Sequence, residues 1–141
     1  MNYPDKPVWV ANPASLEKMV ADLSTHPIIA VDTESNSLFA YYEQVCLIQF
    51  STPDTDYLVD SLAIEDLSLL GKLFADPKIE VVFHAAEYDL ICLKRDFGFT
   101  FTNIFDTMIG ARNLGWKRTG LGNILEENFG VKVNKKYQRA N

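Results

Sequence analysis

The stretch IIAVDTE, residues 28–34, places an apolar run directly before two carboxylates. An apolar run rich in β-branched residues predicts a buried strand. Side chains two positions apart in a strand share a face, so Asp32 and Glu34 project together while Thr33 points away. Two close carboxylates repel unless one is protonated or a cation lies between them, and hard oxygen ligands suit Mg²⁺ or Mn²⁺. The alternative, that the strand ends here and both acids face water, stays open.

A second stretch repeats this logic later in the chain. VVFHAAEYDL, residues 81–90, predicts a strand followed by a helix that carries Asp89 one turn in. An acid on the sheet-facing side of that helix is costly to desolvate alone. If Asp89 points at the two strand acids, a shared divalent ion resolves the cost for all three, whereas periodicity alone equally allows Asp89 to face solvent.

Periodicity and turn signals predict alternating elements along the chain. The expected helices are 12–23, 67–74, 85–97, 108–114 and 121–129, and the expected strands are 28–34, 45–51, 57–60 and 79–83. Asp106 is a candidate N-cap for the helix that begins at Met108. Three adjacent strands followed by alternating helices and strands predict an α/β fold with a mixed central sheet flanked by helices.

Charge is distributed unevenly over the 141 residues, whose net charge is −6. Residues 1–111 carry six Lys and Arg against seventeen Asp and Glu, and residues 112–141 carry seven against two. An acidic body can hold metal while a basic end attracts phosphate, although a solvated basic tail accounts equally well for the charge alone. The candidate phosphate-steering residues are Lys117, Arg118, Lys132, Lys135, Lys136 and Arg139.

Several classes of protein are disfavoured by simple features. The longest apolar runs fall far short of the ~20 residues that span a bilayer, and the N-terminal stretch does not read as a signal peptide, so no membrane partner is expected. Cys46 and Cys92 lie in apolar contexts, which favours reduced thiols and a cytoplasmic location. No feature of the sequence indicates an oligomeric state.

Four ordered motifs resemble one known family. They are DTE (32–34), YYEQVCLIQFS (41–51), FHAAEYDL (83–90) and FDTM (105–108). This order is similar to that of ribonuclease D and, more broadly, of the DEDD 3′–5′ exonucleases, which include the proofreading domains of family A DNA polymerases. The resemblance runs from about residue 28 to 138. It implies a ribonuclease H-like fold, two Mg²⁺ or Mn²⁺ ions held by four carboxylates, and a single-stranded RNA or DNA 3′ end as substrate, with RNA favoured.

The resemblance also implies roles for individual residues. Asp32 matches the acid that bridges both metals, while Glu34 and Asp89 each match a ligand on one side. Leu38 matches a position that packs an apolar side chain on the terminal base, although an ordinary packed leucine fits as well. The other candidate substrate-binding residues are Thr33, Tyr42, His84 and Asp106.

Each of these assignments has a simpler alternative. Tyr41 and Tyr42 can stack on a base or simply cover the loop. His84 can touch a phosphate, but a histidine that ends a strand is more often a hydrogen-bonded structural residue. Asp106 reads chiefly as a helix cap near the site.

The third motif of the family, Tyr-x-x-x-Asp on a late helix, is not found. In ribonuclease D it follows a Trp-x-x-Arg-Pro-Leu stretch, and this sequence stops before one. Tyr137 and Asn141 imitate the spacing and are assigned no role. We therefore expect a single exonuclease domain over residues 1–141, truncated at its C-terminus, with activity reduced by ~10²–10³-fold for each missing group. The alternative function is a catalytically inactive nucleic-acid-binding or interaction domain.

Overall fold

The computed structural model describes residues 6–36 and 41–134, and within these ranges one six-stranded sheet carries five helices. The strands are β1 (Val8–Val10), β2 (Ile28–Ser35), β3 (Val45–Ser51), β4 (Asp56–Asp60), β5 (Glu80–Phe83) and β6 (Ile104–Asp106). The helices are α1 (Pro13–Leu23), α2 (Ser68–Ala75), α3 (Ala86–Phe97), α4 (Thr107–Asn113) and α5 (Leu121–Phe129). Every helix and strand expected from the sequence is confirmed to within one or two residues at each end.

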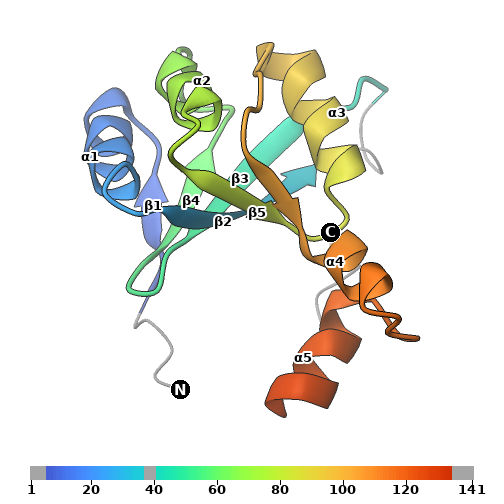
Figure 1. Cartoon of the computed structure of the whole chain (residues 1–141). Coiled ribbons are helices and arrows are strands. Elements are labelled where there is room, and N and C mark those ends of the chain that lie inside the picture. The colour runs from blue at the N-terminus through green and yellow to red at the C-terminus, as the bar shows by residue number, and fades with distance from the viewer. Residues whose placement is uncertain (1–5, 37–40, 135–141) are drawn as a thin grey trace.

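The sheet is mixed and has β2 inside it. The strand order is β1-β4-β3-β2-β5-β6, with β2 antiparallel to β3 and parallel to β5. Figure 1 shows α1, α2 and α3 side by side over one face of the sheet, while α4 and α5 extend from its β6 end. This arrangement confirms the predicted α/β class and brings α3 next to the strand that carries Asp32 and Glu34.

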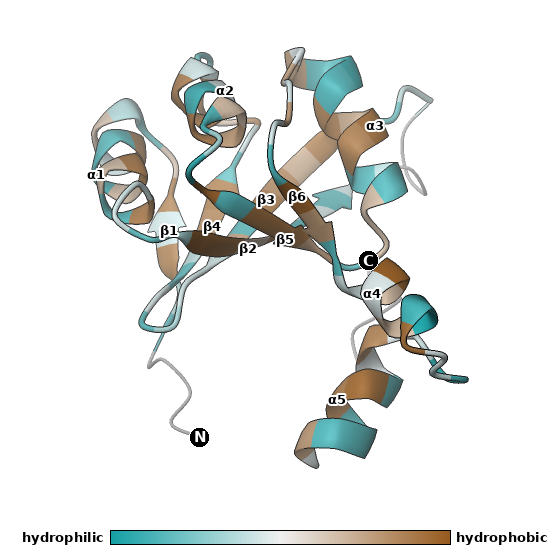
Figure 2. Ribbon diagram, in the orientation of Figure 1, coloured by the Kyte–Doolittle hydropathy of each residue, from teal (hydrophilic) through white to brown (hydrophobic). Residues whose placement is uncertain are grey.

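Local sequence signals explain where α1 begins and what it covers. The Asn12 side chain accepts a hydrogen bond from Ser15 N at 2.9 Å in a capping box, and Pro13 occupies the first helical position. Leu16, Met19 and Leu23 then bury one face of the helix against the sheet. Figure 2 shows that hydrophobic residues follow the central strands beneath these helices.

A cluster of aromatic rings fills the core under α2 and α3. Phe74 is fully buried and stacks on Phe50 at 5.9 Å between ring centroids. Phe101 and Phe99 pack on the same ring at 4.8 and 5.4 Å. Because buried aromatics contribute large apolar areas, this cluster fixes α2 to the sheet.

Two strands were missed by the sequence prediction. β1 and β6 have three residues each and form the two edges of the sheet. The prediction made Asp106 the cap of a helix that begins at Met108; the helix begins at Thr107, and Phe105 and its cap residue Asp106 also form the end of β6. Short edge strands have too few residues to show a period of two, so only their pairing partners define them. None of the helices in the described ranges is long and apolar enough to cross a bilayer.

Candidate active site

Two acids project from the C-terminal end of β2. Asp32 and Glu34 are exposed, whereas Val31 is buried and Thr33 is partly buried, as a strand period of two predicts. Asp32 pairs with Gln49 of β3, and the register shifts just after Glu34. A bulge at this point changes the direction of the strand directly beyond the acids. Both carboxylates therefore lie on one face at the end of a rigid strand.

Asp89 reaches the same strand from α3. β5 pairs with β2 over Ile28–Ala30, which leaves the edge of β2 beyond Ala30 open on that side. There the Thr33 hydroxyl donates a hydrogen bond to Asp89 Oδ1 at 2.5 Å, and Asp89 is only 8% exposed. Thr33 does point away from the two acids, and the side that it faces is the side from which Asp89 arrives.

The three carboxylates influence one another electrostatically. Burial raises the pKa of Asp89, and the charge of Asp32 adds to that rise while the Thr33 hydrogen bond opposes it. The pKa of Glu34 is also raised, first by burial and then by the charges of Asp32 and Asp89. Like charges at short range disfavour ionisation, so the Glu34 and Asp89 shifts show that the three carboxylates lie close enough for their charges to interact.

The three carboxylates have the right chemistry to bind a divalent cation, although their side chains do not point toward one common position. In the ranges 6–36 and 41–134 no three His, Cys, Asp or Glu side chains are close enough together to hold a metal ion. Asp89 lies on Thr33, whereas Asp32 and Glu34 project from the other face of the strand. Carboxylate oxygens are the ligands that Mg²⁺ and Mn²⁺ prefer, and a cation would relieve the mutual repulsion. We therefore treat these three residues as the candidate metal ligands.

Asp106 fixes the start of the helix that carries Asp89. Its Oδ1 accepts from Met108 N at 2.8 Å as the predicted cap of α4, and Oδ2 accepts from Ala86 N at 2.8 Å at the start of α3. Oδ1 also accepts from Ala85 N at 3.1 Å. Ala85 has φ 58°, a left-handed conformation that non-glycine residues rarely adopt. The helix-cap interpretation of Asp106 is confirmed, and this one carboxylate joins α3 to α4.

Asp106→Ala is expected to lower the free energy of unfolding by about 1–3 kcal/mol, since it removes a helix cap and leaves several amides without their acceptor. Burial acts against ionisation, but the backbone N–H groups outweigh it and lower the pKa of Asp106. The stabilisation is therefore complete above the ordinary aspartate value of 3.8 and is lost as the pH falls through the lower folded-state pKa. Urea unfolding of Asp106→Ala and of Asp54→Ala, in an exposed turn, measures the difference. Equal losses for both variants would contradict this role.

His84 lies beside Asp32 in a cavity of about 450 Å³. The Thr107 hydroxyl donates to the Phe83 carbonyl at 3.1 Å and lies 2.8 Å from His84 Nδ1. Because a hydroxyl has a single proton, His84 must donate from Nδ1, which leaves Nε2 as the acceptor of the neutral ring. His84 is thus a hydrogen-bonded structural residue, and its proposed contact with a substrate phosphate stays a prediction.

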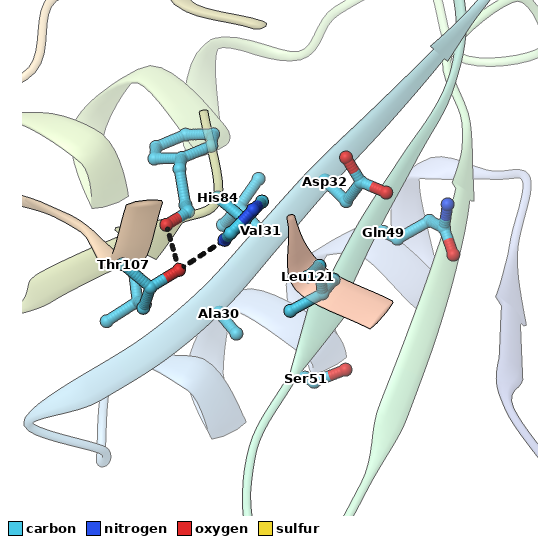
Figure 3. Close-up of a pocket in the computed structure, with 10 residues that line it drawn as sticks. Ala30, Val31, Asp32, Gln49, Ser51, His84, Thr107 and Leu121 are labelled. Carbon is cyan, nitrogen blue, oxygen red and sulfur yellow. Dashed lines mark hydrogen bonds between the residues drawn. The ribbon is translucent and has the colours of Figure 1, made fainter. Parts of the chain in front are cut away.

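Residues that the sequence prediction missed line the same cavity. Gln49 and Ser51 of β3, Thr107 of α4 and Leu121 of α5 surround it together with Asp32. Figure 3 shows Gln49 and Ser51 on the strand next to the one that carries Asp32, with Leu121 in front of them. The alternation of polar and apolar residues in VCLIQFS carried this signal, since Gln49 and Ser51 lie two apart on one face.

The other residues predicted to contact substrate differ in their surroundings. Tyr42 is 81% exposed and Tyr41 is 94% exposed, and their rings form an edge-to-face pair at 4.9 Å. Thr33 already donates its hydroxyl to Asp89, which gives it a structural contact at the site. Leu38 lies outside the described residues. The predicted contacts of these residues with a substrate remain predictions.

The basic residues proposed to attract phosphate also differ in their surroundings. Lys117 and Lys132 are exposed near α5, and Arg118 pairs with Glu127 at 2.8 Å and donates to Asn123. The carboxylate partly neutralises the arginine, so the arginine attracts phosphate less strongly. Lys135, Lys136 and Arg139 lie outside the described residues, as do Tyr137 and Asn141. Cys46 and Cys92 are both free, as expected for reduced thiols.

The structure is thus an α/β domain with a mixed sheet, in which two acids of the inner strand β2 and one acid of α3 lie at the end of that strand. Residues 7–141 match the family model described as a 3′–5′ exonuclease. The chain belongs to this 3′–5′ exonuclease family, with the ribonuclease H-like fold of its ribonuclease D members. The predicted resemblance to ribonuclease D is confirmed.

Named relatives make the match more specific. The chain is 42% identical over 135 residues to the exosome complex exonuclease RRP6 of Saccharomyces cerevisiae, which covers 95% of this chain and 18% of the yeast protein. The catalytic core of RRP6 from Trypanosoma brucei matches with a TM-score of 0.90 at 36% identity, over 96% of this chain and 38% of that one. Escherichia coli RNase D matches with a TM-score of 0.87 at 31% identity, over 100% and 37%. The chain thus spans only a minor part of these relatives.

Proposed function

We propose that this chain is a divalent-metal-dependent 3′–5′ exoribonuclease domain that removes nucleotides from single-stranded RNA. The observation that carries the proposal is that Asp32, Glu34 and Asp89 all lie near the end of β2, where the charges of Asp32 and Asp89 raise the pKa of Glu34, in a member of the 3′–5′ exonuclease family. The preference for RNA rests on the relatives, since E. coli RNase D is described as an exoribonuclease involved in structured RNA processing. The cytoplasmic location expected from the sequence stays a prediction.

The three acids would divide the work as the family resemblance implies. Asp32 would hold both of two Mg²⁺ or Mn²⁺ ions, while Glu34 and Asp89 would each hold one. When bound, such ions lower the pKa of the attacking water and neutralise charge on the scissile phosphate and leaving 3′ oxygen. Asp89 Oδ1 already accepts a hydrogen bond from the Thr33 hydroxyl. To bind an ion, Asp89 would either give up this hydrogen bond or keep it alongside the ion.

The residues around the acids would bind and orient the RNA end. Tyr41 and Tyr42 offer exposed rings on which bases can stack. His84, held through Nδ1 by Thr107, would present Nε2 toward the cavity beside Asp32 and donate to a phosphate oxygen when protonated. The exposed Lys117 and Lys132 would attract the backbone, which makes binding weaken as salt rises.

The test is degradation of a single-stranded RNA labelled separately at each end, with Mn²⁺ and with EDTA. We expect the 3′ label to leave first as a mononucleotide and the 5′-labelled strand to shorten stepwise, because hydrolysis proceeds from the 3′ end. EDTA is expected to stop both. A matched single-stranded DNA measures the preference for RNA.

One observation favours a second function, because the acids are not gathered into a ready site among the described residues. An inactive RNA-binding domain would bind the labelled RNA without shortening it at any Mn²⁺ concentration. Release of internal fragments in place of mononucleotides would contradict both functions.

A further inference from the structure

The connection between β2 and β3 carries the two exposed tyrosines. Its ends are closed by Asn36 and Gln44, since Asn36 N donates to Gln44 O at 3.2 Å and Gln44 N donates to Asn36 Oδ1 at 2.8 Å. Tyr41 and Tyr42 directly precede Glu43 in this connection. The contacts that hold Glu43 therefore also restrict the positions of the Tyr41 and Tyr42 rings.

Glu43 joins this connection to two neighbouring elements at once. Its Oε1 accepts from the Ser35 hydroxyl at 3.1 Å, at the end of β2, and from the Tyr88 hydroxyl of α3. Its Oε2 accepts from Arg95 Nη1 at 2.8 Å, two turns further along α3. A single carboxylate thus bridges the end of the strand that carries Glu34 and the helix that carries Asp89.

The partner on α3 is itself held in place. Arg95 Nε pairs with Asp96 Oδ1 at 2.6 Å, and Asp96 Oδ2 accepts from Val45 N at 2.7 Å, at the start of β3. The Glu43 side chain is only 25% exposed. An ion pair that is partly sheltered and built on a fixed arginine loses less entropy on forming than a free surface pair.

Contacts other than those of Glu43 also hold the acids of the candidate site. Asp32 and Glu34 are fixed by pairing of β2 with β3, and Asp89 is fixed by burial and by Thr33. The tyrosine-bearing connection, in contrast, is joined to α3 through Glu43. This division separates an effect on RNA binding from an effect on the chemical step.

We infer that Glu43 is a positioning residue, which clamps the connection carrying Tyr41 and Tyr42 onto α3 and so presents the two rings to the RNA. The inference rests on the proposed function. Glu43→Gln keeps the shape, removes the charge that pairs with Arg95, and sets its NH₂ group against either Tyr88 or Arg95, both of which are donors. A base stacked on an aromatic ring gains about 5- to 150-fold in affinity, so a loosened ring is expected to raise KM for single-stranded RNA about tenfold. Because the acids stay in place, kcat is expected to change less than twofold.

A double-mutant cycle separates this role from a general structural one. In a chain that carries Tyr41→Ala and Tyr42→Ala, Glu43→Gln is expected to leave KM unchanged, since there are no rings left to position. Glu17→Gln, on the exposed side of α1, serves as the matched control and should leave KM unchanged in either chain. A full tenfold effect of Glu43→Gln in the tyrosine-free chain would overturn the inference.

Hydrogen exchange provides a readout that needs neither metal nor activity. Glu43→Gln is expected to speed amide exchange in residues 41–45 and to leave the interior of β2 unchanged. If the unmodified chain does not degrade RNA, the proposed exonuclease function fails, and RNA affinity by fluorescence anisotropy replaces KM in the same cycle. Unchanged exchange in residues 41–45 overturns the clamp in either case.

Discussion

Asp32→Asn is expected to lower the rate of Mn²⁺-dependent release of 3′ nucleotides from RNA by about 10³-fold or more. Asp32 is exposed at the end of β2, lines the cavity beside His84, and raises the pKa values of both Glu34 and Asp89 through its charge. Its neutral amide keeps the shape of the side chain and removes the anionic ligand. Single-turnover degradation of 5′-labelled RNA measures the loss.

The stability of this variant provides the control. Because Asp32 repels Glu34 and Asp89, its neutralisation is expected to leave the melting temperature unchanged or to raise it. Lost activity with a retained melting temperature then assigns the effect to the site. Asp54→Asn, in the exposed turn between β3 and β4 and not among the residues that line the cavity, is the matched aspartate variant and should retain its rate. A rate for Asp32→Asn within tenfold of the unmodified chain would contradict the assignment.

Phe74→Ala is expected to lower the free energy of unfolding by about 3–5 kcal/mol. The ring is fully buried and contacts the rings of Phe50, Phe99 and Phe101, so its removal leaves a cavity that three aromatic neighbours cannot fill without moving. A loss of this size is a large part of the stability of a typical domain. Urea unfolding followed by circular dichroism measures it.

Two comparisons make this result specific. Phe74→Leu, which keeps most of the apolar volume, is expected to cost clearly less than Phe74→Ala. Phe105→Ala removes a ring that is 47% exposed and is expected to cost under about 1.5 kcal/mol. The aromatic cluster would not be the centre of the core if Phe74→Ala and Phe105→Ala were equally destabilising.

Local patterns predicted most of the fold because the helices and long strands encode their own periods. The spacing of Leu16, Met19 and Leu23, and the Asn12 cap, determine α1 without reference to distant residues. β1 and β6 depend instead on parallel pairing with β4 and β5, which are distant in sequence. Three residues show no period, so the sheet edges could only be found from the structure.

For the candidate site too, local patterns could be predicted from the sequence, whereas long-range contacts could not. The period of two predicted that Asp32 and Glu34 share a face, whereas helical periodicity left open whether Asp89 faces the sheet or solvent, and the structure buries it. The contact of Asp89 with Thr33 could not be predicted, because it depends on where β5 stops pairing with β2. The links made by Glu43 likewise join positions 45 and 52 residues apart. Such contacts exist only once the chain has folded.

Calorimetric titration of Mn²⁺ into the chain tests the central claim most directly, because the three carboxylates are proposed to bind a divalent cation together. The unmodified chain is expected to bind Mn²⁺ with an affinity at least about tenfold higher than Asp32→Asn, which lacks the proposed shared ligand. Asp54→Asn is expected to match the unmodified chain. Equal Mn²⁺ affinity for the unmodified chain and Asp32→Asn would contradict a metal site at the end of β2.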